Sequence, residues 1–229
     1  MKILIIDNMI DRDCWGSQDL CELVRKVSKD TIYVRRAPHD DLPTSPKTFD
    51  RIILSGSKTS ALDDAPWISQ LHHFVRKAVD LGKPFLGVCY GHQTLVRALG
   101  GKANVRKADS PELGWTQIKI SEPSSLMEGL PSTFYSFSSH YDEVSELPTG
   151  MKRLAFSKDC LIQACQLEKL PIYGIQFHPE KNLEDAKNKL LEKKRTGFPT
   201  QLLNPDCSDD LYDPQIGETL FTNFLLNEK

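Results

Sequence analysis

The sequence predicts an α/β fold in which a mixed, mostly parallel sheet is flanked by helices. Up to about residue 100, short apolar runs alternate with amphipathic runs of helical period. Strands that are apolar along nearly their whole length are typical of parallel sheets covered on both faces. After Gly101, strand-like runs follow one another, separated by Gly, Pro, Ser and Asp. This change predicts an antiparallel portion joined to the parallel half, with some strands returning to the same sheet.

The elements of the parallel half are expected in alternating order. Leu71, Phe74 and Ala78 recur at three- and four-residue spacing, which indicates a helix with one buried stripe. The expected strands are Lys2–Asp7, Thr31–Arg36, Arg51–Ser55 and Pro84–Cys89. The expected helices are Ser17–Ser28, Trp67–Leu81 and Gly91–Leu99.

The rest of the chain is expected to continue the same domain. A charged helix is expected at Glu184–Arg195, and a final helix at Gly217–Asn227. Between them, Thr196–Ile216 has three prolines and no clear period, and loops of this length are usually functional or disordered. We therefore expect one domain over residues 1–229, with an inserted helix and loop at about 184–216. The expected later strands are Gly101–Arg106, Trp115–Ile120, Phe134–His140, Arg153–Ser157, Leu161–Leu167 and Ile172–Phe177.

Composition and charge exclude several classes of protein. The chain has 29 Lys and Arg against 31 Asp and Glu, a net charge of −2. Proteins that neutralise nucleic-acid phosphates are usually basic, so no nucleic-acid partner is expected. No apolar run approaches the ~20 residues that span a bilayer, and the start, Met1–Asp7, reaches a charge too soon for a secretory signal. No membrane partner is expected.

The cysteines do not indicate a disulfide scaffold or a metal site. The six cysteines include no Cys-x-x-Cys pair, and zinc sites normally need tighter spacing. Without a secretory signal, the expected location is the reducing cytoplasm, where thiols stay free. Neither a metal nor a cofactor is expected.

The sequence motif that most strongly indicates catalysis surrounds Cys89. An apolar strand leads into Cys89, and a helix begins directly after it, which is the pattern of a nucleophile elbow. Gly87 and Gly91 flank the turn, where a Cβ would crowd it. The helix N-terminus favours a thiolate, and the backbone N–H of Tyr90 would point into the same space as an oxyanion donor. The alternative is a buried, inert cysteine at a strand end.

His178 and Glu180 are the expected partners of that thiolate. His178 ends an apolar strand, so it is expected at the same carboxyl edge of the sheet as Cys89. Glu180, two residues later, can reach back to the imidazole and hold its tautomer. A nucleophile, a general acid/base and a group that orients it together support covalent catalysis. The alternative is a histidine in a turn beside Pro179 with an exposed glutamate.

The runs Gly87–Gln93 and Phe177–Glu180 resemble the motifs of the class I, or triad, glutamine amidotransferase family. The resemblance extends from about residue 2 to Glu180, includes the last helix, and implies a flavodoxin-like class I glutamine amidotransferase domain. Within the family, the chain most resembles the GMP synthase glutaminase domain, through Gly16–Gln18, Ile53–Gly56 and Ser139–Asp142. It is also similar to γ-glutamyl peptidases of this fold, through Ser55–Ser57 and Asp142–Val144.

The resemblance implies a role for each matching position. Cys89 would attack the side-chain amide of glutamine, His178 would protonate the leaving ammonia, and Glu180 would orient His178. Water activated by His178 would then hydrolyse the γ-glutamyl thioester. The implied oxyanion donors are at Ser57 and Tyr90, and the implied substrate-binding residues are Gly56, Gln93, His140 and Tyr141.

Two positions depart from the family pattern. The oxyanion loop reads Gly56-Ser57-Lys58, where amidotransferases usually have Gly-Gly-Pro or Gly-Pro-Gly, and Ser57 would need more energy than glycine to adopt an unusual φ. Tyr141 stands where GMP synthases tend to have glycine, and its ring is expected to narrow or reshape the substrate mouth.

The chain has no synthetase-type phosphate loop, which leaves the acceptor open. It is expected either to supply ammonia to a synthetase subunit in trans or to hydrolyse a γ-glutamyl peptide or conjugate alone. Both reactions share one acyl-enzyme. A silent binding module is a further hypothesis, although such relatives usually lack the nucleophile or the histidine, and Cys89 and His178 are both present. The segment 184–216 is expected to form a lid or a partner-docking surface, unless it is a solvated excursion.

Overall fold

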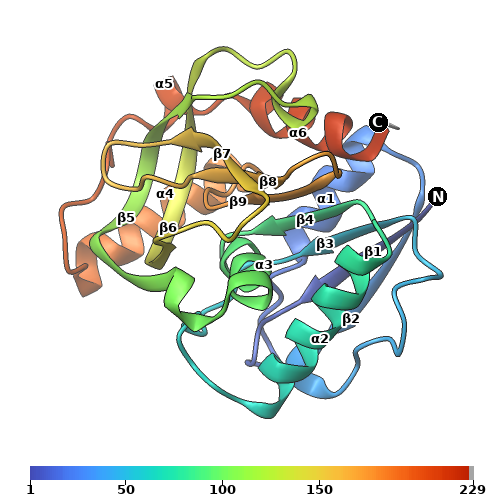
Figure 1. The fold of residues 1–229 in the computed structure, drawn as a ribbon. Helices are drawn as coiled ribbons and strands as arrows, with labels where there is room; N and C mark the ends of the chain where they lie inside the picture. Colours follow the sequence, from blue (N-terminus) through green and yellow to red (C-terminus); the bar gives the residue numbers. More distant parts are fainter. Residues whose placement is uncertain (227–229) are drawn as a thin grey trace.

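One mixed sheet lies at the centre of the structure. The computed structural model describes residues 1–226. The parallel strands are β1 (Lys2–Asp7), β2 (Thr31–Arg36), β3 (Arg51–Leu54), β4 (Phe85–Val88) and β9 (Ile172–Ile175). The antiparallel strands are β5 (Val105–Ile120), β6 (Thr133–Val144), β7 (Met151–Phe156) and β8 (Ala164–Leu167). Their order across the sheet is β2-β1-β3-β4-β9-β8-β7-β5-β6, with β2 and β6 at opposite edges (Figure 1).

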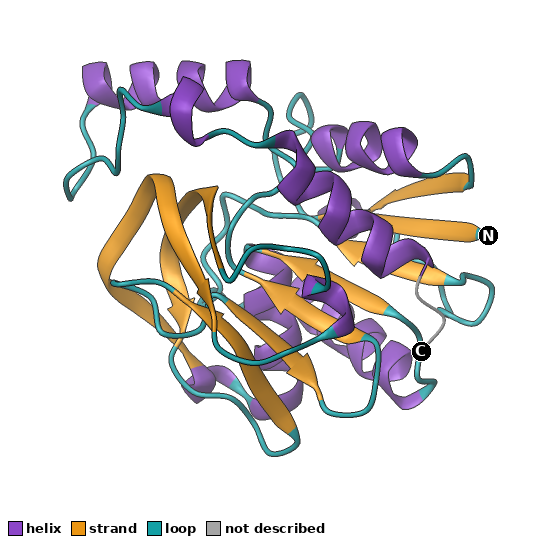
Figure 2. Cartoon of the chain, turned by 90° about the horizontal axis from the view of Figure 1, so that it is seen from above, coloured by secondary structure: helices purple, strands orange, loops and turns teal. Residues whose placement is uncertain are grey.

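Helices cover both faces of the parallel half (Figure 2). On β1, Ile3 and Ile5 belong to the apolar cluster of one face, and Leu4 and Ile6 belong to the cluster of the other. Covered on both sides, these strands are apolar along nearly their whole length, as predicted. The helices of the first face are α1 (Gln18–Val27) and α6 (Pro214–Leu226), and those of the second are α2 (Pro66–Asp80) and α3 (Tyr90–Gly100).

The predicted fold class is confirmed, and one strand prediction is wrong. As expected, β9 returns to the parallel half, where it pairs with β4. Only the last two residues of the strand expected at Gly101–Arg106 are extended, since Lys102–Asn104 form a 3-10 helix. These two residues begin one long strand, β5, which also contains the strand expected at Trp115–Ile120, and a register shift between Lys107 and Glu112 keeps both halves paired with β6. The final helix begins earlier than expected, at Pro214, and Asn227 lies outside the described residues.

The segment after the predicted charged helix is fixed to β5. That helix is α4 (Leu183–Thr196), and the aperiodic stretch behind it contains a short helix, α5 (Ser208–Leu211). Leu203 donates its N–H to Leu113 O (2.8 Å) and accepts the N–H of Trp115 (3.0 Å). Gly114 has a φ of +127°, and a Cβ there would lie 2.1 Å from Leu203 O. The close approach of these two backbones therefore requires glycine.

The carboxyl ends of the parallel strands share one edge of the sheet. Asp7 ends β1, Ser55 follows β3, Cys89 follows β4, and His178 lies three residues after β9. Ligand and active sites of parallel α/β sheets typically lie at this edge. Within residues 1–226, no helix combines the length and the apolar character that crossing a bilayer requires.

Candidate active site

Cys89 lies on a strained turn between β4 and α3. Its φ of +52° falls where side chains are uncommon, and such strain tends to cluster at functional sites. Two glycines make room for the turn, because a Cβ at Gly87 would lie 2.3 Å from Gly91 O and one at Gly91 would lie 2.5 Å from Leu54 O. The N–H of Cys89 donates to Ile175 O at 2.8 Å, which ties the turn to β9.

The structure brings Cys89, His178 and Glu180 together. His178 Nδ1 lies 2.6 Å from Glu180 Oε1, and the Cys89 side chain lies beside His178, close enough to raise its pKa. Since Glu180 occupies Nδ1, the other ring nitrogen, Nε2, is the one that serves Cys89. Gly56 lies against both reactive side chains, since a Cβ there would be 3.1 Å from His178 Cε1 and 3.8 Å from Cys89 Cβ.

The charges in this group support an imidazolium. Burial by itself lowers the pKa of His178, but the negative charges of Glu180 and Cys89, with hydrogen bonds to both, raise it to about 10. Burial raises the pKa of Glu180, yet the charge and hydrogen bond of His178 hold it below its usual value. The arrangement can therefore hold a proton on His178 beside the sulfur and release it to a leaving group.

The expected oxyanion loop is held by its own side chains. Ser57 Oγ donates to Asn8 O (2.7 Å) and accepts the N–H of Thr59 (3.0 Å). Ser55 is tied to the same loop, since its Oγ accepts the N–H of Asn8 at 3.0 Å and its O accepts Asn8 Nδ2 at 2.8 Å. Neither Gly56 nor Ser57 has a positive φ, so the strain expected for serine at position 57 does not arise.

The other expected donor, Tyr90, has separate roles for its backbone and its ring. Tyr90 is the first residue of α3, and a helix supplies no acceptor for its first N–H. The ring is buried and packs on Trp67, with centroids 6.1 Å apart. Burial also raises the pKa of the Tyr90 hydroxyl. The ring thus supports the fold, and only the backbone is suited to bind an oxyanion.

Gln93 belongs to a buried network that ends at the sulfur of Cys89. Gln93 Nε2 donates to Asp142 O (2.7 Å) and to Gln176 Oε1 (3.0 Å), and Gln176 Nε2 donates to Cys89 Sγ at 3.5 Å. Sequence reasoning missed Gln176. Its position two residues before His178 could have indicated that it belongs to the site, because in extended chain the side chains of residues i and i+2 point to the same face. Gln176 can stabilise negative charge on the sulfur.

Both ring nitrogens of His140 belong to a buried hydrogen-bond network. Its Nε2 lies 2.8 Å from Glu112 Oε2, and its Nδ1 lies 3.1 Å from Asp142 O. Glu112 also accepts Ser157 Oγ (2.7 Å) and Gln163 Nε2 (2.6 Å). His140 is 3% exposed, so the backbone of this stretch, rather than the imidazole, is suited to meet a substrate.

A cavity of about 400 Å³ opens above Cys89. Tyr141 and Phe198, which belong to β6 and to the segment after α4, line it with ring centroids 5.2 Å apart. The cavity also has four lysines, Lys58, Lys107, Lys189 and Lys193, in its wall. Of the predicted site residues, the wall includes Ser57, Cys89, Tyr90, Gln93, His140 and Tyr141.

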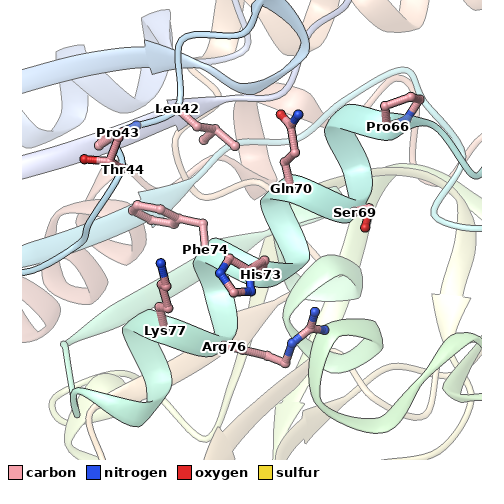
Figure 3. Close-up of a pocket in the computed structure, with 10 residues that line it drawn as sticks. All are labelled: Leu42, Pro43, Thr44, Pro66, Ser69, Gln70, His73, Phe74, Arg76 and Lys77. Carbon is pink, nitrogen blue, oxygen red and sulfur yellow. The ribbon is translucent and has the colours of Figure 1, made fainter.

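A second cavity, of about 630 Å³, lies between α2 and residues 42–44 (Figure 3). His73, Arg76 and Lys77 line its α2 side, and none of the predicted site residues belongs to its wall. Among residues 1–226, no three His, Cys, Asp or Glu side chains are grouped so that they could hold a metal ion.

Solved structures of other proteins share this fold. A glutamine amidotransferase from Methylobacillus flagellatus superposes with a TM-score of 0.82 at 22% identity, covering 98% of this chain and 94% of that one. A glutamine amidotransferase from Thermotoga maritima gives a TM-score of 0.79 at 18% identity, covering 98% of this chain and 96% of that one. Identities this low establish the fold alone.

Sequence relatives extend the comparison. The chain is 34% identical over 184 residues to a glutamine-hydrolysing GMP synthase of Clostridium novyi, matching 78% of this chain but only 32% of that longer protein. It is 32% identical over 179 residues to one subunit of the glutamine-hydrolysing GMP synthase of Methanococcus maripaludis, covering 77% of this chain and 93% of the relative. The family model of class-I glutamine amidotransferases matches residues 14–196. The chain therefore belongs to the class-I glutamine amidotransferase family.

Proposed function

We propose that this protein hydrolyses the side-chain amide of glutamine through a γ-glutamyl thioester on Cys89, and so releases glutamate and ammonia. The observation that carries the proposal is that His178 lies between Glu180 (2.6 Å) and the Cys89 side chain. Cys89 itself lies on a strained turn and lines a cavity. A nucleophile, a proton carrier and an orienting carboxylate in this order are suited to acyl transfer.

In the first half of the reaction, Cys89 Sγ would attack the amide carbon. The backbone N–H groups of Ser57 and Tyr90 would stabilise the oxyanion, and each such donor typically contributes about 10²- to 10³-fold to the rate. As the C–N bond breaks, the proton on His178 Nε2 would pass to the nitrogen, and ammonia would leave. Gly56, Gln93 and the backbone at His140 and Tyr141 would position the glutamyl group.

In the second half, His178 would act as a base. The negative charge of Cys89 is one cause of the raised pKa of His178, and forming the thioester removes that charge. The imidazole would then hold its proton less tightly, which favours first its transfer to ammonia and next the removal of a proton from water. That water would attack the thioester, break the C–S bond and release glutamate.

The fate of the ammonia separates two candidate functions. Several relatives are named as one subunit of a GMP synthase, which supports a role as the glutaminase subunit of a synthetase in trans, of the GMP synthase kind. The second candidate is a γ-glutamyl peptidase that hydrolyses a γ-glutamyl peptide or conjugate without a partner. The cavity favours this second function, because it extends from Cys89 to Lys193 and Phe198 and has room beyond one amide group.

The test is glutamate release by the purified chain from glutamine and from γ-glutamyl peptides. We expect hydrolysis that is lost in Cys89→Ala, while Cys207→Ala, which alters an exposed thiol, keeps it. Rapid peptide hydrolysis with poor use of glutamine would support the peptidase. Hydrolysis that survives in Cys89→Ala would refute both functions.

A further inference from the structure

The cavity above Cys89 is rimmed by more positive than negative side chains. Its wall has four lysines, Lys58, Lys107, Lys189 and Lys193, which we call the lysine rim, against two acids, Asp142 and Glu192. Lys107 Nζ lies 3.3 Å from Asp142 Oδ1, and Lys189 Nζ lies 3.1 Å from Glu192 Oε2. Within residues 1–226, neither Lys58 nor Lys193 has a carboxylate within ion-pair distance. Two positive charges of the rim are thus left uncompensated.

The lysine rim joins two separate parts of the chain across one opening. Lys58 belongs to the oxyanion loop, whereas Lys189 and Lys193 lie one helical turn apart on α4. The hydrogen bond and charge of Lys189 hold the pKa of Glu192 below its usual value, and Lys193 and Lys58 add to this effect. The oxyanion loop and α4 therefore both place positive charge close to Glu192.

The position of α4 over the cavity is fixed. Ala186 and Leu190 of α4 are buried in an apolar cluster with Leu113 and Trp115 of β5. Lys189 and Lys193 are each half-buried, and both line the cavity. A charged group that enters this space would meet the lysines on its way to Cys89.

Glutamine does not match this charge pattern. Its α-ammonium and α-carboxylate cancel, so a bound glutamine leaves the surplus positive charge in place. Asp142 Oδ1 is buried and already lies 3.3 Å from Lys107 Nζ, so it neutralises a lysine within the rim. A substrate with a second carboxylate would neutralise more of the lysine rim.

We propose that the lysine rim binds a carboxylate on the amine half of the substrate, so that the site prefers γ-glutamyl peptides or conjugates with an acidic leaving group. This inference rests on the proposed acyl-transfer chemistry at Cys89. The Cys89 Sγ–carbon bond forms as the peptide C–N bond breaks, and His178 gives its proton to the departing amine. Water then cleaves the thioester, which yields glutamate and an amine that carries the carboxylate.

The test compares two substrates that differ only in this charge. γ-Glutamylglycine has a carboxylate on its leaving group, and γ-glutamylglycinamide has a neutral amide in the same place. For the purified full chain, we expect kcat/KM to be roughly three- to tenfold higher for the acid. This ratio should fall as salt is added, because screening weakens the attraction to partly exposed charges.

Variants of the lysine rim locate the effect. In Lys58→Met combined with Lys193→Met, we expect the ratio of the two kcat/KM values to fall close to one. The matched control is Lys119→Met, an exposed lysine at the far end of β5, in which the ratio should stay as in the unmodified chain. Comparing the ratio within each variant cancels any change in the amount of folded protein.

Separate outcomes test the two levels of the proposal. No glutamate from glutamine or from either peptide would refute the proposed hydrolysis itself. Hydrolysis with a ratio near one in the unmodified chain, or with the same raised ratio in the double variant, would overturn the role of the lysine rim and leave the chemistry at Cys89 intact.

Discussion

Cys89 has backbone angles that are rare for a residue with a side chain, and this strain should be measurable. Strained conformations of this kind cost about 1–3 kcal/mol. Cys89→Gly removes both the sulfur and the strained Cβ, whereas Cys89→Ala removes only the sulfur. We expect the glycine variant to be more stable than the alanine variant by about 1 kcal/mol in urea unfolding. At most other positions a glycine variant is less stable than an alanine variant. If Cys89→Gly were likewise less stable than Cys89→Ala, the strain at this position would be contradicted.

Glu180 should set the pH range of activity through His178. With the pKa of His178 raised to about 10, the imidazolium persists across neutral pH and is lost as the pH rises through 10. In Glu180→Gln one of the groups that raise this pKa is removed, so the alkaline limb of kcat/KM should move to lower pH. We also expect kcat/KM to fall by roughly 10²- to 10³-fold. An unchanged limb, as expected for the exposed control Glu122→Gln, would contradict this role.

The residues of the site differ in how far the sequence predicts them. Cys89 and His178 each follow an apolar strand, and the shared edge of a parallel sheet explains their proximity. Gln176 lies in the same stretch as His178, but a buried glutamine just after a strand matches no motif, and its contact with Cys89 depends on the packing of β9 against the turn. For His140, the sequence gives no sign that Glu112 holds its side chain.

At the scale of the elements, β5 anchors the segment that carries α4 over the cavity. A Cβ at Gly114 would collide with Leu203 O, so Gly114→Ala should detach residues 197–213 from β5. We expect faster cleavage by a protease in this segment and a weaker preference for acidic γ-glutamyl substrates. Gly82→Ala is the matched control, because Gly82 also has a positive φ but has no atom within 4 Å of the added Cβ. Equal protease resistance of the two variants would contradict the anchoring.

The elements also show where sequence patterns stop being informative. The apolar stripe at Leu71, Phe74 and Ala78 predicts α2 to within a residue, since burial repeats with the helical period. Residues 108–111 include Pro111, so their sequence predicts the end of a strand. In the structure β5 continues through them, and its pairing with β6 is irregular there. The path of residues 197–213 depends on Leu203 and Trp115, which are distant in sequence.

At the scale of the whole molecule, the parallel half supplies the reactive groups and the antiparallel half supplies the walls of the cavity. Cys89 and His178 come from the ends of β4 and β9, whereas Tyr141 and Lys107 come from the β5–β6 pair. The segment after β9 closes the cavity with Lys193 and Phe198. Bond cleavage and substrate selection thus depend on different parts of the fold. We expect mutations in the cavity walls to change substrate preference, and mutations at the ends of β4 and β9 to change the rate for all substrates.

The most direct test of covalent catalysis is the mass of the protein during turnover. Glutamine is mixed with the chain, the reaction is stopped in acid, and the intact mass and the peptide that contains Cys89 are measured. We predict a fraction of chains heavier by one γ-glutamyl group, attached at Cys89 and absent in Cys89→Ala. Glutamate release without any adduct at Cys89, or with the adduct on another residue, would contradict the mechanism.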